Sequence, residues 1–204
     1  MSMPVNQTLF DRALQEHRTV IEKLRAQWPV LEQIATEMTR AVHAGNKVMW
    51  CGNGGSAADS QHLAAELVGR FRRERPGLSS IALTTDTSVL TSIGNDYGYE
   101  KIFSRQVEAH CAPGDVLVGI STSGNSQNVC LALDAGRRMG AFTVAFTGEG
   151  GGAMAGVADA VLSIPSRDTA RIQEGHILCG HMLCDWIELS VCNSVAAKEE
   201  LTRR

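Results

Sequence analysis

From Lys47 onward, short apolar runs alternate with longer stretches of helical spacing, and this alternation limits the possible folds more than any other feature. The apolar runs are Val48–Cys51, Ser80–Leu83, Val116–Ile120, Phe142–Phe146 and Ala160–Ile164. The helix-like stretches lie at about 56–72, 100–111, 126–139, 150–157 and 171–195. Strands that alternate with helices form a parallel sheet covered on both faces. The sequence therefore predicts an α/β fold, a three-layer αβα sandwich around a five-stranded parallel sheet.

The first 45 residues have a different pattern. Residues 6–27 carry apolar positions at helical spacing, Pro29 can open a second helix, and Gly45 with Asn46 can end it. We expect an N-terminal helical hairpin over 1–45, followed by an α/β core and C-terminal helix over 46–204. At 204 residues the whole chain is expected to be a single domain.

The net charge and the cysteine pattern bear on which partners and which compartment the protein can have. The net charge of −3 argues against a nucleic-acid-binding surface, which needs a concentrated basic field. A local basic cluster follows the helix predicted at 56–72 and consists of Arg70, Arg72, Arg73 and Arg75. Such a cluster is typical of a solvated turn, although Arg70 could reach a bound anion. The six cysteines show neither CxxC pairs nor disulfide spacing, which fits a reducing compartment.

No membrane segment or signal peptide is expected. Asp185 and Glu188 interrupt the most apolar segment, so no run reaches the ~18 apolar residues of a membrane span. The N-terminus lacks the basic-then-apolar pattern of a signal peptide. We therefore expect a cytoplasmic protein. The last helix is apolar on almost every side and needs burial, which predicts a homo-oligomer, with the N-terminal hairpin as a second candidate interface.

Two loops rich in glycine and hydroxyl residues follow predicted strands, where ligands bind in such sheets. Gly52–Ser56 has three glycines that permit close backbone approach, and Ser121–Ser126 combines hydroxyls with a helix start that favours an anion. The hydroxyl loop matches neither GxxxxGK[ST] nor GxGxxG, so a nucleotide ligand has little support. Each loop could also be a plain helix-capping turn.

Two helical segments carry candidate catalytic or metal-binding side chains. His62 and Glu66 are four residues apart and share one helix face. Gln173 and His181 recur on the terminal helix, eight residues apart, which is only about 80° of rotation. We assign structural roles to three other histidines, which are His17, His43 and His176. Phosphate-binding loops with an acid/base or metal pair indicate an enzyme acting on a small phosphorylated molecule.

Together these motifs resemble the sugar isomerase (SIS) domain family, with its flavodoxin-like sheet, and most closely the phosphoheptose isomerases. Several separated motifs in one order are far more specific than any single one. The matching segments are Cys51–Ser56, Gln61–Glu66, Thr84–Asp86 with Gly94–Asp96, Gly119–Ser126, and Arg171–Glu174 with His181. Some relatives carry an Asp where this chain has Ala170, and Asp168 is the nearest acid.

The resemblance implies conversion of sedoheptulose 7-phosphate to D-glycero-D-manno-heptose 7-phosphate through an enediol(ate), for ADP/GDP-heptose biosynthesis. It implies catalysis by Glu66 and His181, a zinc site in some members, and tetramers with active sites at subunit contacts. The implied zinc ligands are His62, Glu66, Gln173 and His181. The residues expected to contact the sugar phosphate are Asn53, Gly54, Gly55, Ser56, Glu66, Asn95, Asp96, Ser121, Thr122, Ser123, Ser126 and Gln173.

Several points stay open from the sequence. Glu66 could act as a free base or as a metal ligand, and glutamine is an unusual zinc ligand. The heptose could feed a lipopolysaccharide core, a capsule or another glycoconjugate. One rival is a non-enzymatic SIS-domain scaffold similar to the DnaA initiator-associating protein, which lacks equivalents of Glu66 and His181. The other rival is a sugar-phosphate-sensing module that binds without reacting.

Overall fold

Five parallel strands form one sheet in the order β2-β1-β3-β4-β5. The computed structural model describes residues 5–202, with side chains for 6–194. The strands are β1 (Val48–Gly52), β2 (Ser80–Ala82), β3 (Val116–Ser121), β4 (Phe142–Thr147) and β5 (Ala160–Ser163). The predicted five-stranded parallel sheet is confirmed. Gly52 of β1 pairs with Ile120 of β3, so the loops that follow these two strands are neighbours.

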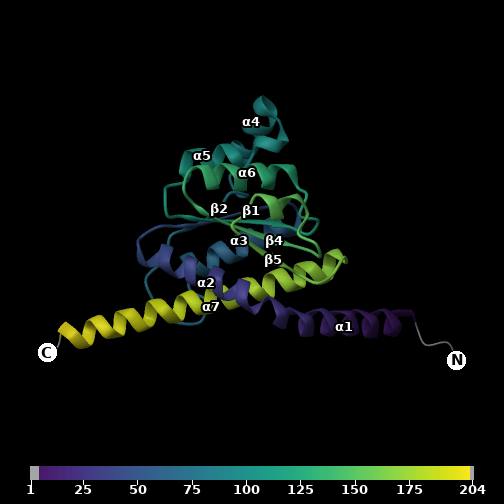
Figure 1. The fold of residues 1–204 in the computed structure, drawn as a ribbon, viewed down its shortest axis with the longest axis horizontal. Helices are drawn as coiled ribbons and strands as arrows, with labels where there is room; N and C mark the ends of the chain where they lie inside the picture. The colour runs from purple at the N-terminus through teal and green to yellow at the C-terminus, as the bar shows by residue number, and fades with distance from the viewer. Residues whose placement is uncertain (1–4, 203–204) are drawn as a thin grey trace.

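Alternate strand residues face two separate hydrophobic cores, which makes three layers (Figure 1). Trp50 and Val118 belong to the core under α2, α3 and α7, whereas Met49 and Leu117 belong to the core under α5, α6 and η3. These helices are α2 (Trp28–His43), α3 (Gly55–Val68), α5 (Ser104–His110), α6 (Gln127–Arg138), η3 (Gly152–Gly156) and α7 (Thr169–Thr202).

The N-terminal region is helical, but it is not the expected hairpin. Helix α1 (Val5–Lys23) passes through a 3-10 turn, η1 (Leu24–Gln27), into α2. Figure 1 shows α2 leading away from the end of α1 rather than folding back along it. Both helices pack against α7. The short η1 turn does not reverse the chain. Each of the two helices buries its apolar side against α7, so they do not need to pack along each other.

Some predicted elements differ in extent. Helix α4 (Thr87–Tyr97) was not expected; none of its residues is fully buried, and only Leu90 and Ile93 pack against the core as partly buried side chains. Asp86 caps the helix by accepting from the Val89 N–H. It is followed by the short η2 (Tyr99–Lys101). The helix expected at 150–157 is the 3-10 turn η3, and α3 ends at Val68 rather than near 72.

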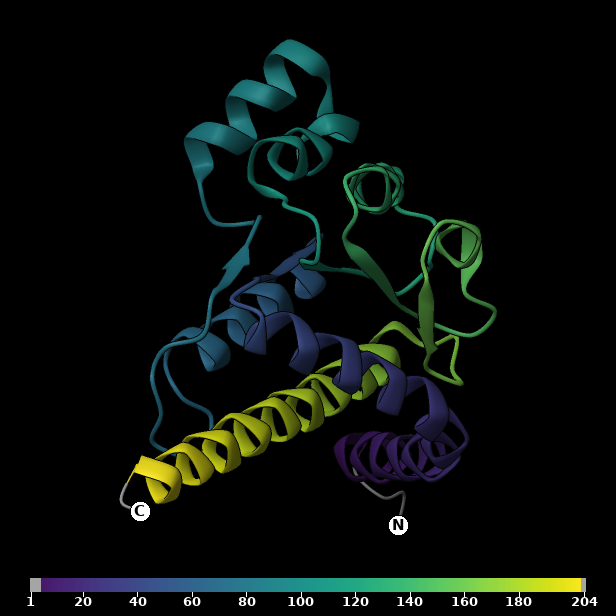
Figure 2. The same cartoon turned by 60° about the vertical axis from the view of Figure 1, so that its left-hand side comes forward.

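Helices α3 and α7 lie side by side and point in the same direction (Figure 2). A Cβ on Gly180 of α7 would lie 2.5 Å from Leu63 Cδ1 of α3, and a Cβ on Gly55 would clash with the Gln173 amide. The contacts Gly55–Gln173 and Leu63–Gly180 advance along both helices together, so α3 runs parallel to the first half of α7. None of the helices in the described part of the chain is long and apolar enough to cross a membrane.

Candidate active site

His62, Glu66 and His181 come together between α3 and α7. His62 Nε2 lies 2.9 Å from His181 Nε2 and 3.2 Å from Glu66 Oε1. One ligand atom from each of the three residues lies within 4.8 Å of the others. Glycine at position 180 lets α7 approach α3 closely beside His181. The predicted convergence of these three side chains is therefore present within one chain.

The surroundings of His181 favour a neutral imidazole. Burial lowers the pKa of His181 below its ordinary value, the charges of His62 and Arg72 lower it further, and Glu66 acts in the opposite direction. The Phe71 ring stacks on the His181 ring, with centroids 5.3 Å apart and planes 23° apart. A neutral imidazole can accept a proton or bind a metal ion.

The donor set of this cluster is one that zinc accepts. Two imidazole nitrogens and a carboxylate are typical zinc ligands, and tetrahedral sites with Zn–N distances near 2.0–2.1 Å place two ligand nitrogens about 3.3 Å apart. The His62 and His181 nitrogens at 2.9 Å need only a small adjustment to reach that spacing. The three side chains therefore fit a zinc ion.

The Gln173 side chain lies against the glycine loop. Its amide packs against Gly55, at the first residue of α3. His62 is seven residues after Gly55 in α3, so their backbones are about 10 Å apart along the helix axis, at about 1.5 Å per residue. Gln173 is thus placed to contact a ligand held by the loop, and its role as a metal ligand stays a prediction.

The hydroxyl loop after β3 gathers its side chains at the start of α6. Ser121 Oγ lies 2.8 Å from Ser126 Oγ and 3.3 Å from Ser123 Oγ. Gly124 has a φ of +65° and packs so tightly on Gly151 and Gly152 that a Cβ would clash with their backbone. Thr122 accepts from the Gly148 N–H through its carbonyl. The loop is thereby held as a compact hydroxyl-lined turn, a suitable cradle for phosphate.

The glycine loop after β1 is held by residues that sequence analysis did not single out. Asn53 and Asn128 exchange two side-chain hydrogen bonds of 2.9 Å, and Tyr99 donates its hydroxyl to Asn53 Oδ1 at 2.9 Å. Asn128 is buried at the start of α6. In the sequence, the one local indication of a role for Asn128 was its position two residues after Ser126, at the start of the predicted helix. Asn53 and Gly54 also line a cavity of about 420 Å³ that extends beneath α4.

Asn95 and Asp96 lie at the end of α4. Asn95 donates to Asp96 Oδ1 at 2.8 Å, and this pair is exposed. Gly94, directly before them, lines the cavity of about 420 Å³ below α4. The structure thus places the pair near the rim of the glycine-loop cavity, and their contact with a sugar phosphate stays a prediction.

The three histidines predicted to be structural make contacts away from the candidate site. His176 is fully buried against the Thr147 carbonyl, and burial lowers its pKa to about 4. His17 contacts Glu174 at 2.8 Å and His43 contacts Ser190 at 3.0 Å. All six cysteines are free, as expected, and burial raises the pKa values of three of them to about 12, which makes them poor nucleophiles; these are Cys51, Cys179 and Cys184.

The basic cluster after α3 is only partly the solvated turn that its composition indicates. Arg75 is buried and its Nε lies 3.4 Å from Glu188 Oε1. Arg72 and Arg73 both pair with Asp185 of α7. Arg70 is exposed, with its Nε 3.9 Å from Glu74. The expectation holds for Arg70 and Arg72, which are exposed, and fails for Arg75, which is buried because Glu188 of α7, more than 100 residues later in the chain, is its partner.

Comparison with known proteins agrees with this architecture. A family model for the SIS domain matches residues 14–148. A phosphoheptose isomerase from Akkermansia muciniphila is 58% identical over 161 residues, which are 79% of this chain and 85% of the relative. The chain belongs to the phosphoheptose isomerase family.

Solved structures of phosphoheptose isomerases share the fold over nearly their full length. The protein from Neisseria gonorrhoeae has a TM-score of 0.85 and 43% identity, covering 90% of this chain and 99% of that one. The protein from Francisella tularensis has a TM-score of 0.86 and 36% identity, covering 92% of this chain and 100% of that one. The resemblance to phosphoheptose isomerases is therefore confirmed.

Proposed function

We propose that the protein is a phosphoheptose isomerase that converts sedoheptulose 7-phosphate to D-glycero-D-manno-heptose 7-phosphate through an enediol(ate). The observation that carries this proposal is the meeting of His62, Glu66 and His181 beside α3, the helix that begins at the glycine loop. A scaffold or a sensor has no need for a carboxylate and two imidazoles converging within 4.8 Å.

The size of the substrate matches the spacing of the site. The phosphorus and C1 of an extended heptose 7-phosphate are eight bonds apart, about 10 Å at about 1.2 Å per bond. The first turn of α3, beside the hydroxyl loop, lies about 10 Å from His62. A phosphate held by Ser121, Ser123 and Ser126 therefore places the reacting end of the sugar at the histidine cluster, with Gln173 alongside the chain between them.

The chemistry needs two proton movements, one between C1 and C2 and one between the oxygens on these carbons. We assign the carbon-bound proton to Glu66, since a carboxylate can take it from C1 and return it to C2. His181 is assigned to the oxygens, because a neutral imidazole can donate from one nitrogen and accept at the other.

A zinc ion would be held by His62, Glu66 and His181, with Gln173 as the further predicted ligand. Bound there, zinc would supply a Lewis acid that stabilises the negative oxygen of the enediolate. Glu66 can serve both roles proposed for it because a carboxylate has two oxygens, and only one is needed to hold the ion.

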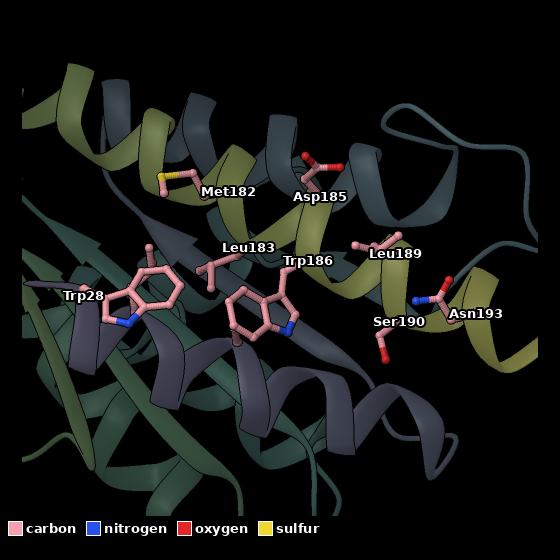
Figure 3. A pocket seen from close by; sticks show the side chains of 10 residues that line it. Trp28, Met182, Leu183, Asp185, Trp186, Leu189, Ser190 and Asn193 are labelled. Carbon is pink, nitrogen blue, oxygen red and sulfur yellow. The ribbon is translucent and has the colours of Figure 1, made fainter. Parts of the chain in front are cut away.

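The proposed assembly is a homotetramer in the cytoplasm, with active sites at subunit contacts. Helices α1 and α7 extend past the body of the domain in opposite directions (Figure 1). Between α2 and α7 lies an apolar groove of about 540 Å³, where Trp28 and Trp186 lie side by side with ring centroids 5.7 Å apart (Figure 3). The Trp28 and Trp186 residues remain 46% and 37% exposed, which favours burial by another subunit.

The test is a turnover assay with sedoheptulose 7-phosphate on protein of known metal content, before and after chelation. Glu66→Gln and His181→Ala should each abolish turnover while the oligomer survives. Full activity in either variant would remove the proposed mechanism. Thermal stabilisation by the sugar phosphate without product would instead indicate the sensing module.

A further inference from the structure

A buried carboxylate on α7 holds the segment that follows α3. Glu188 has no exposed surface, and its two oxygens accept the backbone N–H groups of Phe71, Arg72 and Arg73 at 2.9, 2.8 and 2.8 Å. Burial would raise the pKa of Glu188, but these donors and Arg75 lower it below its ordinary value. The carboxylate is therefore charged and fully engaged.

Arg75 closes the same segment from the other end. Its side chain is 1% exposed, its Nε lies 3.4 Å from Glu188 Oε1, and its guanidinium donates to the carbonyls of Glu66, Leu67 and Gly69. Residues 69–75 are thus fastened both to α7 and to the last turn of α3. We call this arrangement of Glu188, Arg75 and residues 69–75 the clamp.

The clamp carries a side chain that touches the candidate catalytic histidine. Phe71 stacks on His181 with ring centroids 5.3 Å apart, and the Arg72 guanidinium lies 4.9 Å from the centroid of the Phe71 ring. His181 is seven residues before Glu188, about two turns along the same helix face. One helix therefore carries both the reacting imidazole and the carboxylate that orients its stacking partner.

We propose that Glu188 and Phe71 are positioning residues for the isomerisation, and that the clamp fixes the ring plane of His181 through the Phe71 stack. This inference rests on the proposed function for its kinetic consequence. The ring orientation itself does not depend on any reaction. Without the stack, the His181 ring can rotate about its side-chain torsions and its nitrogens lose their alignment with the sugar oxygens.

The kinetic test compares two changes at position 71. Phe71→Leu keeps an apolar side chain but removes the ring, and should lower kcat about tenfold with KM changed less than about twofold, because the phosphate loops are untouched. Phe71→Tyr restores a ring and should return kcat to within about twofold of the original. Glu188→Gln should resemble Phe71→Leu, since an amide cannot accept three N–H bonds through both of its ends.

A matched control lies at the amino end of the central strand β3. Asp115 is also a fully buried carboxylate that accepts backbone N–H groups, those of Lys47 and Ala112. Asp115→Asn should lower thermal stability as Glu188→Gln does, but leave kcat within about twofold. If Asp115→Asn lowers kcat as much as Phe71→Leu, the effect is one of general stability and the positioning role is wrong.

A spectroscopic test does not need turnover. The imidazole C–H proton resonances of His181, assigned with His181→Asn and recorded with chelator, should move in Phe71→Leu and Glu188→Gln when the ring current of Phe71 is lost or displaced. They should move little in Phe71→Tyr, and those of buried His176 should not move. If the His181 resonances do not move in Phe71→Leu and Glu188→Gln, the positioning role is wrong, even if the original protein is an active enzyme. If they do move but the original protein has no turnover, only the proposed function is contradicted.

Discussion

The Nε2 atoms of His62 and His181 lie 2.9 Å apart although 119 residues separate them in the chain. Two neutral imidazoles can face each other at this distance only if one donates to the other, or if both lone pairs point at a shared ion. The second arrangement, completed by Glu66, is the one that makes a metal site.

Removing one histidine of this pair should remove the metal. We expect about one zinc per subunit in the original protein and a large loss in His62→Ala, measured by elemental analysis after dialysis. At a free zinc concentration of 100 times Kd, the bound ion should raise the unfolding free energy of the original protein by about 3 kcal/mol, and a chelator should remove this gain. The unfolding free energy of His62→Ala should not change when the chelator is added. His43→Ala is the control. An equal zinc content in the His62→Ala and His43→Ala proteins would contradict the proposed metal site.

Gly55→Ala should impair catalysis by displacing Gln173. A methyl group at position 55 would overlap the Gln173 amide, so the side chain must leave its place. We expect kcat/KM to fall about tenfold, because positioning errors near 1 Å can cost that much or more. Gly156→Ala is the control, since a Cβ there meets open space. Equal kinetics for the two variants would show that the position of Gln173 does not matter.

Asn128→Leu should weaken substrate binding without touching the substrate. The change removes both hydrogen bonds that Asn128 exchanges with Asn53 and leaves the Asn53 amide partly unpaired, at a cost of about 1–3 kcal/mol in folding stability. KM for sedoheptulose 7-phosphate should rise. Tyr99→Phe, which removes one hydrogen bond, should cost about 1 kcal/mol and raise KM less. The idea fails if a folded Asn128→Leu protein retains the original KM.

Asp59 should make the metal-free protein less stable as the pH rises. Burial raises its pKa to about 6, although His62 acts in the opposite direction, and its Oδ2 is buried without a partner among the described residues. Because the folded-state pKa exceeds the unfolded value of 3.8, stability is lost as the pH rises from about 4 to 6. Asp59→Asn should therefore gain about 1 kcal/mol at pH 8 and little at pH 4, after allowance for solvent screening. Denaturant unfolding with chelator measures this; a gain that does not depend on pH would contradict it.

Trp186→Glu should disrupt the assembly. The residue lies in the apolar groove between α2 and α7, and a charge there would be buried without a partner if another subunit covers it. Light scattering should show a smaller species than for the original protein. Tyr97→Glu on α4 is a control with a comparably exposed aromatic residue. An unchanged mass for Trp186→Glu would place the subunit contact elsewhere.

Much of the fold follows from local patterns in the sequence. The apolar runs around Val48, Val116 and Phe142 are short, bounded by turn residues and separated by helical stretches, so they predicted the parallel sheet correctly. His62 and Glu66 share a helix face for the same local reason, their spacing of four residues. Helix α4 was missed although Leu90 and Ile93 form a short apolar side, because polar residues and Gly94 make up most of the segment and its hydrophobic pattern is brief.

The site depended on contacts between distant segments. Charges at Arg75 and Glu188 look solvated in the sequence, yet each is buried because the other is its partner. Glu188 was visible as a charge within an apolar helix, but its function as an acceptor for residues 71–73 was not. The expected N-terminal hairpin is not formed, since α1 and α2 each pack mainly on α7.

The sequence by itself determined the five strands and most of the helices, the two glycine- and hydroxyl-rich loops and the candidate site residues, because hydrophobic period, glycine content and helix spacing are local properties. Only the tertiary structure decided which of these residues meet. His181 reaches His62 because α7 lies along α3 in parallel, and Gly55 and Gly180 allow the two backbones to come close. Such packing depends on the shapes of both helices together, which neither segment carries alone.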